Sequence, residues 1–209
     1  MPEQPSGDDL PEIRTRWSEV SGGIEAAYAY RQRFDDLVAQ GVDVHGEARL
    51  VTALRPPPKG PGMGLNSGLE ALAIRDGTPY AVPERSGAED RPFPILTFRD
   101  NRWDQAGEIR RDPRWLPVGA DFGPDGWFYL LERDFQGILG FASRVRRMEL
   151  TDAGPRNEEI LLTTRALQYD NLEGLAVWHD GQGIRLTMIS DDNFLFVQRT
   201  ELVEYRLRD

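Results

Sequence analysis

Carboxylate side chains recur in this sequence at a spacing that could bring them together. Three acids precede an Asp-Gly pair and stand 51 and 52 residues apart: Glu70, Asp121 and Glu173. A second acid follows each pair, after another short apolar run: Glu84, Glu132 and Asp191. Carboxylate oxygens are the ligands that hard cations such as Ca²⁺ prefer. The pattern therefore suggests metal-assisted chemistry, provided that the fold gathers these side chains.

The Asp-Gly pairs predict the elements that would position the acids. They are Asp76-Gly77, Asp125-Gly126 and Asp180-Gly181, and each lies between short runs of apolar, β-branched and aromatic residues. Glycine in such a pair accepts the positive φ of a tight hairpin turn. The start of one strand and the end of its antiparallel neighbour lie at the same end of a hairpin. We therefore expect both acids of each unit at one rim.

The repeat also predicts the fold class. A period near fifty residues with hairpins inside it is typical of a β-propeller blade. We predict an all-β fold, a partial or small β-propeller with three secure blades and a possible fourth. Residues 17–54 would be a degenerate N-terminal blade or a partly helical segment, and 64–209 the clear repeat region. Residues 1–12 would be a flexible N-terminus, and 13–209 a single domain.

Gathered carboxylates would raise one another's pKa unless cations offset them. Arginines just after the acidic strand ends could do so, namely Arg85, Arg133 and Arg199. The other candidate is Ca²⁺, for which the strongest ligand set is Glu173, Asp191, Asp192 and Asn193. A plainer interpretation is that the acids cap turns and accept backbone N–H bonds.

Arginines at 144, 146 and 147 lie on a predicted strand. Alternation places Arg144 and Arg146 on one face and Arg147 on the other. They could hold a phosphate, although a solvated outer strand is the better interpretation.

Composition limits the partners and the compartment. With 25 basic and 35 acidic residues the formal net charge is -10, which argues against nucleic acid. No apolar run reaches the roughly 18 residues of a membrane span, so no membrane partner is expected. The start at Met1 lacks the pattern of an export signal, which leaves the localisation open and favours the cytoplasm for the chain as written.

Three segments carry a resemblance to a known family. They are Gly68 to Ala73 with Val82-Pro83-Glu84, Pro117 to Phe122 with Leu130 to Arg133, and Asn171 to Ala176 with Ile189 to Asn193 and Gln198-Arg199-Thr200. Over about residues 64–207 the chain resembles the bacterial phytase-like esterase family. The resemblance implies a β-propeller, an esterase or phosphoesterase activity, Ca²⁺ and a periplasmic location. Family members usually carry an export signal and further blades before this segment.

These observations together predict a calcium-assisted hydrolase of small phosphoester or ester substrates. The catalytic residues would be Glu70, Asp121, Glu132, Arg133 and Arg199, with the two arginines neutralising the leaving phosphate. One alternative is a β-propeller that only binds a ligand or a protein, and another is a truncated, inactive family member. Unpaired sheet edges in an open propeller could also pair two copies into a homo-oligomer.

Overall fold

The computed structural model describes residues 68–193 and 198–208. All of them belong to one compact unit, Leu54–Asp209, and the other unit is Met1–Ala53. The predictions for residues 1–12 and 17–54, including the possible fourth blade, lie outside the described residues. None of the described residues forms a helix long and apolar enough to cross a bilayer.

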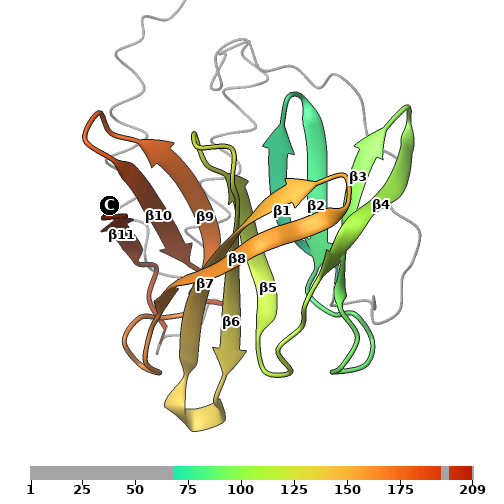
Figure 1. Cartoon of the computed structure of the whole chain (residues 1–209). Helices are drawn as coiled ribbons and strands as arrows, with labels where there is room; N and C mark the ends of the chain where they lie inside the picture. The colour runs from blue at the N-terminus through green and yellow to red at the C-terminus, as the bar shows by residue number, and fades with distance from the viewer. Residues whose placement is uncertain (1–67, 194–197, 209) are drawn as a thin grey trace, which may run out of the picture. The chain divides into compact units, whose positions relative to one another are not determined.

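In the described part, eleven strands form three antiparallel sheets (Figure 1). The first sheet comprises β1 (Leu69–Arg75), β2 (Thr78–Pro83), β3 (Phe93–Arg99) and β4 (Arg102–Ile109). The second comprises β5 (Leu116–Phe122), β6 (Phe128–Phe135), β7 (Phe141–Thr151) and β8 (Gly154–Thr163), with a 3-10 turn, η1 (Gly137–Leu139), between β6 and β7. The third comprises β9 (Leu172–His179), β10 (Ile184–Ser190) and β11 (Leu202–Arg206). Each sheet pairs its strands in chain order, as a propeller blade does. The predicted all-β fold class is confirmed.

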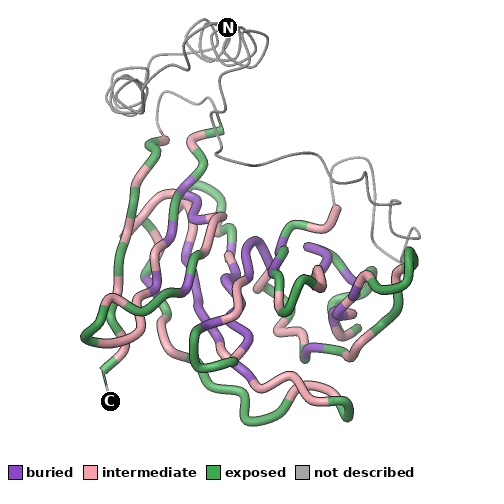
Figure 2. Tube along the Cα trace, turned by 90° about the horizontal axis from the view of Figure 1, so that it is seen from above, coloured by how far each residue is buried: buried purple, intermediate pink, exposed green. Residues whose placement is uncertain are grey.

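Two apolar cores lie between the sheets. The first joins residues such as Val82, Phe93 and Ile95 to Phe128 and Leu130 of the second sheet. The fully buried members of the second core include Tyr129, Leu131, Val145, Leu172 and Met188. In Figure 2 the buried segments run through the interior of this unit while the turns are exposed. The first strands of the sheets also contact in succession, β1 with β5 and β5 with β9.

The three predicted Asp-Gly hairpins are present, but their turns differ in length. The last strand pair before the turn is Arg75 with Thr78 in the first sheet, Phe122 with Phe128 in the second and His179 with Ile184 in the third. The glycines at 77, 126 and 181 all have positive φ, between 72° and 87°. The three turns thus contain two, five and four residues.

Bulges at the start of each sheet show which positions are equivalent. The residue skipped by the strand pairing is Glu70 in β1, Val118 in β5 and Glu173 in β9. Asp121 instead pairs with Tyr129, next to the turn at the other end of β5. The predicted equivalence of Asp121 with Glu70 and Glu173 is therefore wrong, because Asp121 stands four residues before its Asp-Gly pair, whereas Glu70 and Glu173 stand six and seven residues before theirs.

Candidate functional site

In each hairpin, one residue within or just after the second strand pairs with the residue two positions before the bulge. In the first sheet the backbone N–H of Glu84 donates to Gly68 O at 3.2 Å. In the third sheet the N–H of Asp191 donates to Asn171 O at 2.9 Å. In the second sheet Arg133 occupies this place, paired with Leu116. The middle sheet thus contributes a guanidinium where its two neighbours contribute carboxylates.

Arg133 contacts all three sheets through its guanidinium. Its Nη2 lies 3.1 Å from Glu84 Oε1 of the first sheet. Its Nη1 donates to Asn171 Oδ1 at 2.9 Å and also to Glu173 Oε1, both at the start of the third sheet. Asn171 Nδ2 donates to the same Glu173 oxygen at 2.7 Å. We call these four residues the Arg133 cluster.

The side chains of the Arg133 cluster range from nearly buried to partly exposed. The Glu84 side chain is 7% exposed, Arg133 is 22% exposed and Glu173 is 34% exposed. Arg85 Nε lies 3.6 Å from the second Glu84 oxygen. Two guanidinium groups thus face two carboxylates, so these charges balance. A partly exposed carboxylate held beside a guanidinium and an amide can accept a proton from a bound water.

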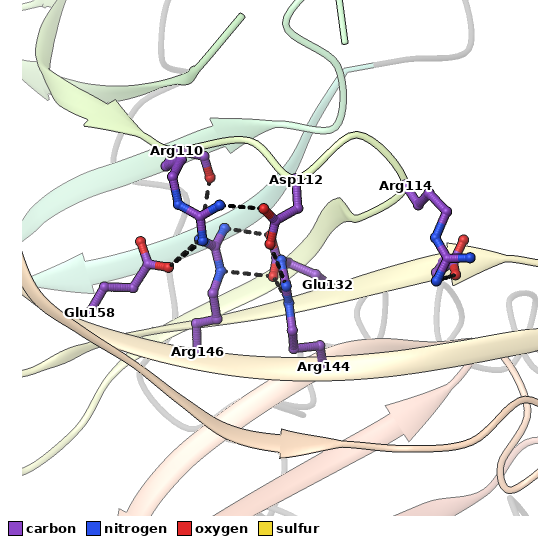
Figure 3. Close-up of polar contacts among 8 residues, drawn as sticks. Arg110, Asp112, Arg114, Glu132, Arg144, Arg146 and Glu158 are labelled. Atoms are coloured by element: carbon purple, nitrogen blue, oxygen red, sulfur yellow. Dashed lines mark hydrogen bonds and ion pairs between the residues drawn. The ribbon is translucent and has the colours of Figure 1, made fainter. Parts of the chain in front are cut away.

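Glu132 lies on the other face of β6, because adjacent strand residues point in opposite directions. It is fully buried. Arg144 Nε donates to it at 2.7 Å, and Arg146 donates from Nε at 2.8 Å and from Nη2 at 2.5 Å (Figure 3). The expectation that Glu132 stands at an open rim beside Glu84 and Glu173 is therefore wrong. Its carboxylate instead accepts hydrogen bonds from two buried arginines.

This buried group continues to the surface as a network of ion pairs (Figure 3). Arg144 Nη1 lies 2.6 Å from Asp112, and Arg146 Nη1 lies 3.0 Å from Glu158. Arg110 pairs with both of these acids. Burial lowers the pKa of the Arg146 guanidinium, but the ion pairs with Glu132 and Glu158 outweigh it and the pKa is raised. Each of these buried charges has an opposite partner, so removing one partner would leave an uncompensated charge in the interior.

The strand that carries these arginines is an inner strand, which corrects the interpretation as a solvated outer strand. β7 pairs with β6 on one side and β8 on the other. The predicted alternation is confirmed, because Arg147 points away from Glu132 and lies 2.8 Å from Glu159. Arg144 also stacks its guanidinium 4.6 Å from the Trp115 ring centre.

Two further candidates accept backbone hydrogen bonds, as the turn-capping interpretation predicts. Glu70 is exposed, and its Oε1 accepts from Gly68 N at 3.3 Å. Asp121 accepts from Phe122 N at 2.8 Å and from Val177 N of β9 at 2.7 Å. Asp121 thus fastens the second sheet to the third.

The predicted calcium ligands at the C-terminal side form a turn. Asp191 Oδ1 accepts from Asn193 N at 3.0 Å, and Asn193 Nδ2 donates to Gln198 at 3.0 Å. Thr200 donates to Asp192 at 3.2 Å. Arg199 is 76% exposed, and its guanidinium lies 3.0 Å from a Glu201 oxygen rather than beside a residue of the Arg133 cluster.

The oxygen atoms of the four predicted ligands are suitable for Ca²⁺, but the side chains do not converge on one point. Within residues 68–193 and 198–208, no three His, Cys, Asp or Glu side chains converge as a metal-binding group. Glu173, the fourth predicted ligand, is engaged by Arg133 and Asn171. The residues therefore do not fit a bound calcium ion as they stand, and the ligand set stays a prediction.

One neighbour of the Arg133 cluster has no counterpart in the sequence-based prediction. Phe141 begins β7, and the Arg133 Cζ atom lies 5.8 Å from its ring centre. Its ring packs against Phe135 with centres 5.0 Å apart. The only sequence feature that marks Phe141 is that it and Phe135 flank the segment Gln-Gly-Ile-Leu-Gly. That segment is typical of an ordinary turn and does not indicate a functional site.

Comparison with known proteins identifies a family. No curated protein matches the chain. Among solved structures, the crystal structure of a levansucrase mutant from Bacillus subtilis matches at a TM-score of 0.36 and 13% identity, over 56% of this chain and 38% of that chain. The family model described as esterase-like activity of phytase matches residues 33–194. The chain therefore belongs to the phytase-like family, as the three repeat segments predicted.

Proposed function

We propose that this chain is an ester hydrolase that binds its substrate at the Arg133 cluster. The observation that carries the proposal is the partly exposed pair of Arg133 and Glu173 at the place where three sheets meet. Membership of the phytase-like family supports a hydrolase.

The cluster offers the two groups that ester hydrolysis needs. Glu173 accepts a proton from the attacking water, and the Asn171 amide holds the carboxylate in position. The Arg133 guanidinium donates to the oxygen on which negative charge develops in the transition state. The ion pair with buried Glu84 holds the Arg133 guanidinium in position, so this side chain needs little reorganisation during the reaction.

The charge of the cluster bears on the substrate class. Because two guanidinium groups balance two carboxylates, an uncharged ester meets no net repulsion. A phosphate ester carries negative charge and would need an additional cation. Calcium would supply that charge and act as a Lewis acid, but its predicted ligands do not converge, and no step is assigned to it.

The test is hydrolysis of p-nitrophenyl acetate and p-nitrophenyl phosphate by the wild type, Glu173→Gln and Arg133→Gln. We expect acetate ester turnover by the wild type and a loss of kcat/KM of about 100-fold in each variant. The control is Arg147→Gln, which removes a charge from the same face of the second sheet but opposite Tyr129, four residues along β6 from Arg133. Equal activity in all four proteins would place the reaction elsewhere.

The second candidate is a module that binds a ligand without reacting. It is favoured by the engagement of Glu70, Asp121 and Glu132 in structural hydrogen bonds. A p-nitrophenyl ester that raises the melting temperature of the wild type but is not hydrolysed would support this module over the hydrolase.

A further inference from the structure

An exposed apolar surface lies at the end of the second sheet that carries Arg133. It comprises the turn between β6 and β7 and one residue of the segment after β8. Its exposed members are Phe135, Ile138, Leu139 and Leu167, and together with the half-buried Phe141 beside them they form what we call the apolar tip. Ile138 is 99% exposed and Leu167 is 70% exposed. In Figure 1 this turn projects beyond the lower end of β6 and β7.

Backbone hydrogen bonds give the turn a defined shape. Gln136 N donates to Gly140 O at 2.8 Å, and Gly140 N donates to Gly137 O at 3.0 Å. Both glycines have positive φ, which a side chain would disfavour. The exposed apolar side chains are therefore displayed by a turn that is already ordered.

Leu167 joins the apolar tip from a different segment. Its φ is 63°, a conformation that suits glycine or asparagine better than leucine. Its side chain lies against Gly140, where a Cβ atom would come within 3.2 Å of Leu167 Cδ2. A leucine is thus held in an unfavourable conformation while most of its apolar surface stays in water.

The apolar tip is continuous with the Arg133 cluster. Phe141 contacts the Arg133 guanidinium on one side and the Phe135 ring on the other. The segment that carries Leu167 leads directly to Asn171, a member of the cluster. A molecule that reacts beside Arg133 and Glu173 can therefore extend over Phe141 onto the tip.

We propose that the apolar tip binds the acyl chain of the ester substrate, so that the preferred substrates are esters of medium-chain fatty acids. This inference rests on the proposed function of the Arg133 cluster. It goes beyond that function because it assigns the substrate specificity to residues outside the cluster. The physical reason is that each methylene group removed from water by the tip favours binding.

The test compares p-nitrophenyl acetate with p-nitrophenyl octanoate, which share a leaving group and differ only in acyl length. For the wild type we expect kcat/KM to be at least about tenfold higher for the octanoate ester. The tip variant is Leu139→Ser/Leu167→Asn, in which asparagine also suits the positive φ at 167. It should lose that preference and hydrolyse the acetate ester within about twofold of the wild type.

The matched control is Ile160→Ser, which removes an exposed apolar side chain from β8, where it pairs with Arg146. It should keep the preference for octanoate. Equal kcat/KM for both esters in the wild type, or an unchanged preference in the tip variant, would overturn the inference. A tip variant that loses self-association or vesicle binding instead would show that a second copy or a lipid surface covers the tip, which also overturns it.

A second measurement separates this inference from the proposed function. Calorimetry with 4-nitroacetanilide and 4-nitrooctananilide measures binding of amide analogues that resist hydrolysis. Tighter binding of the octananilide by the wild type, lost in the tip variant, supports the tip even if neither ester is hydrolysed. Failure of ester hydrolysis alone would overturn only the proposed function, whereas equal binding of both anilides would overturn the tip.

Discussion

The side chain of Arg133 links the three sheets of the described part of the protein. Its guanidinium reaches Glu84 of the first sheet and both Asn171 and Glu173 of the third, while its own strand belongs to the second. Glu84 is nearly buried, so its carboxylate depends on this partner for compensation. A residue in this position serves the fold and the proposed reaction at once.

Replacing Arg133 with glutamine should destabilise the protein by about 2–4 kcal/mol, because Glu84 would lose its buried cation. Urea unfolding monitored by tryptophan fluorescence measures this free energy. In a double-mutant cycle, Arg133→Gln/Glu84→Gln should recover part of the loss, since it removes the buried charge as well. Additive effects of the two single changes would contradict the pairing.

Glu132→Gln tests the buried group shown in Figure 3. The change leaves Arg144 and Arg146 without their shared carboxylate, and we expect a loss of about 3–5 kcal/mol in the free energy of unfolding. The control is Glu159→Gln, whose partner Arg147 is partly exposed, and which should cost less than about 1 kcal/mol. Similar unfolding midpoints for the two variants would argue against a buried ion-pair network.

Asp112 gives this network a pH dependence. Burial raises the pKa of its carboxyl group, but hydrogen bonds and charges from Arg144 and Arg110 outweigh it, so the pKa lies below the ordinary 3.8. A folded-state pKa below the unfolded value stabilises the protein above pH 3.8 and loses this effect as the pH falls through the lowered value.

We therefore expect Asp112→Asn to lower the melting temperature near neutral pH. The difference from the wild type should shrink as the pH falls below 3.8. Melting curves followed by circular dichroism across the acidic range measure it. A difference that stays constant down to the most acidic pH would mean that the carboxylate charge contributes nothing.

At the scale of the elements, turn chemistry and alternation were the reliable sequence signals. The Asp-Gly pairs predicted the three hairpins, and alternation predicted the opposite faces of Arg146 and Arg147. The position of each acid along its strand could not be predicted, because it depends on the pairing register and on a bulge that no residue type marks. A one-residue difference in register turned Glu132 inward and Arg133 toward the other sheets.

The contact between β5 and β9 belongs to this scale. A Cβ atom at Gly119 would lie 2.6 Å from the Glu173 carbonyl oxygen, which is backbone and cannot move aside. Gly119→Ala should therefore push β9 away and destabilise the protein by about 2–3 kcal/mol. Gly68→Ala is the control, since its Cβ would approach nothing closer than 3.9 Å. Equal unfolding free energies for both variants would exclude this close packing.

At the scale of the whole molecule, arginine side chains compensate the negative charges of acids from separate sheets. The sequence left arginine and calcium as alternatives, and it could not choose because side-chain pairing across sheets depends on how the sheets pack. In the described residues, Arg133 links the carboxylates of Glu84 and Glu173, and Arg144 with Arg146 surround Glu132. Among the described residues, the buried acids Glu84 and Glu132 are thus paired rather than isolated charges.

This pairing predicts how the whole molecule responds to calcium. For the wild type we expect the melting temperature in calcium and in EDTA to agree within about 1 °C, because Arg133 and Arg85 already balance the charges of Glu84 and Glu173. Arg133→Gln would leave two carboxylates and the Asn171 amide oxygen together, and calcium should then raise its melting temperature by about 4 °C or more relative to EDTA. Adding Glu84→Gln should abolish that rise. A calcium-dependent rise in the wild type that Asp191→Ala removes would instead assign the ion to the turn formed by Asp191, Asp192 and Asn193.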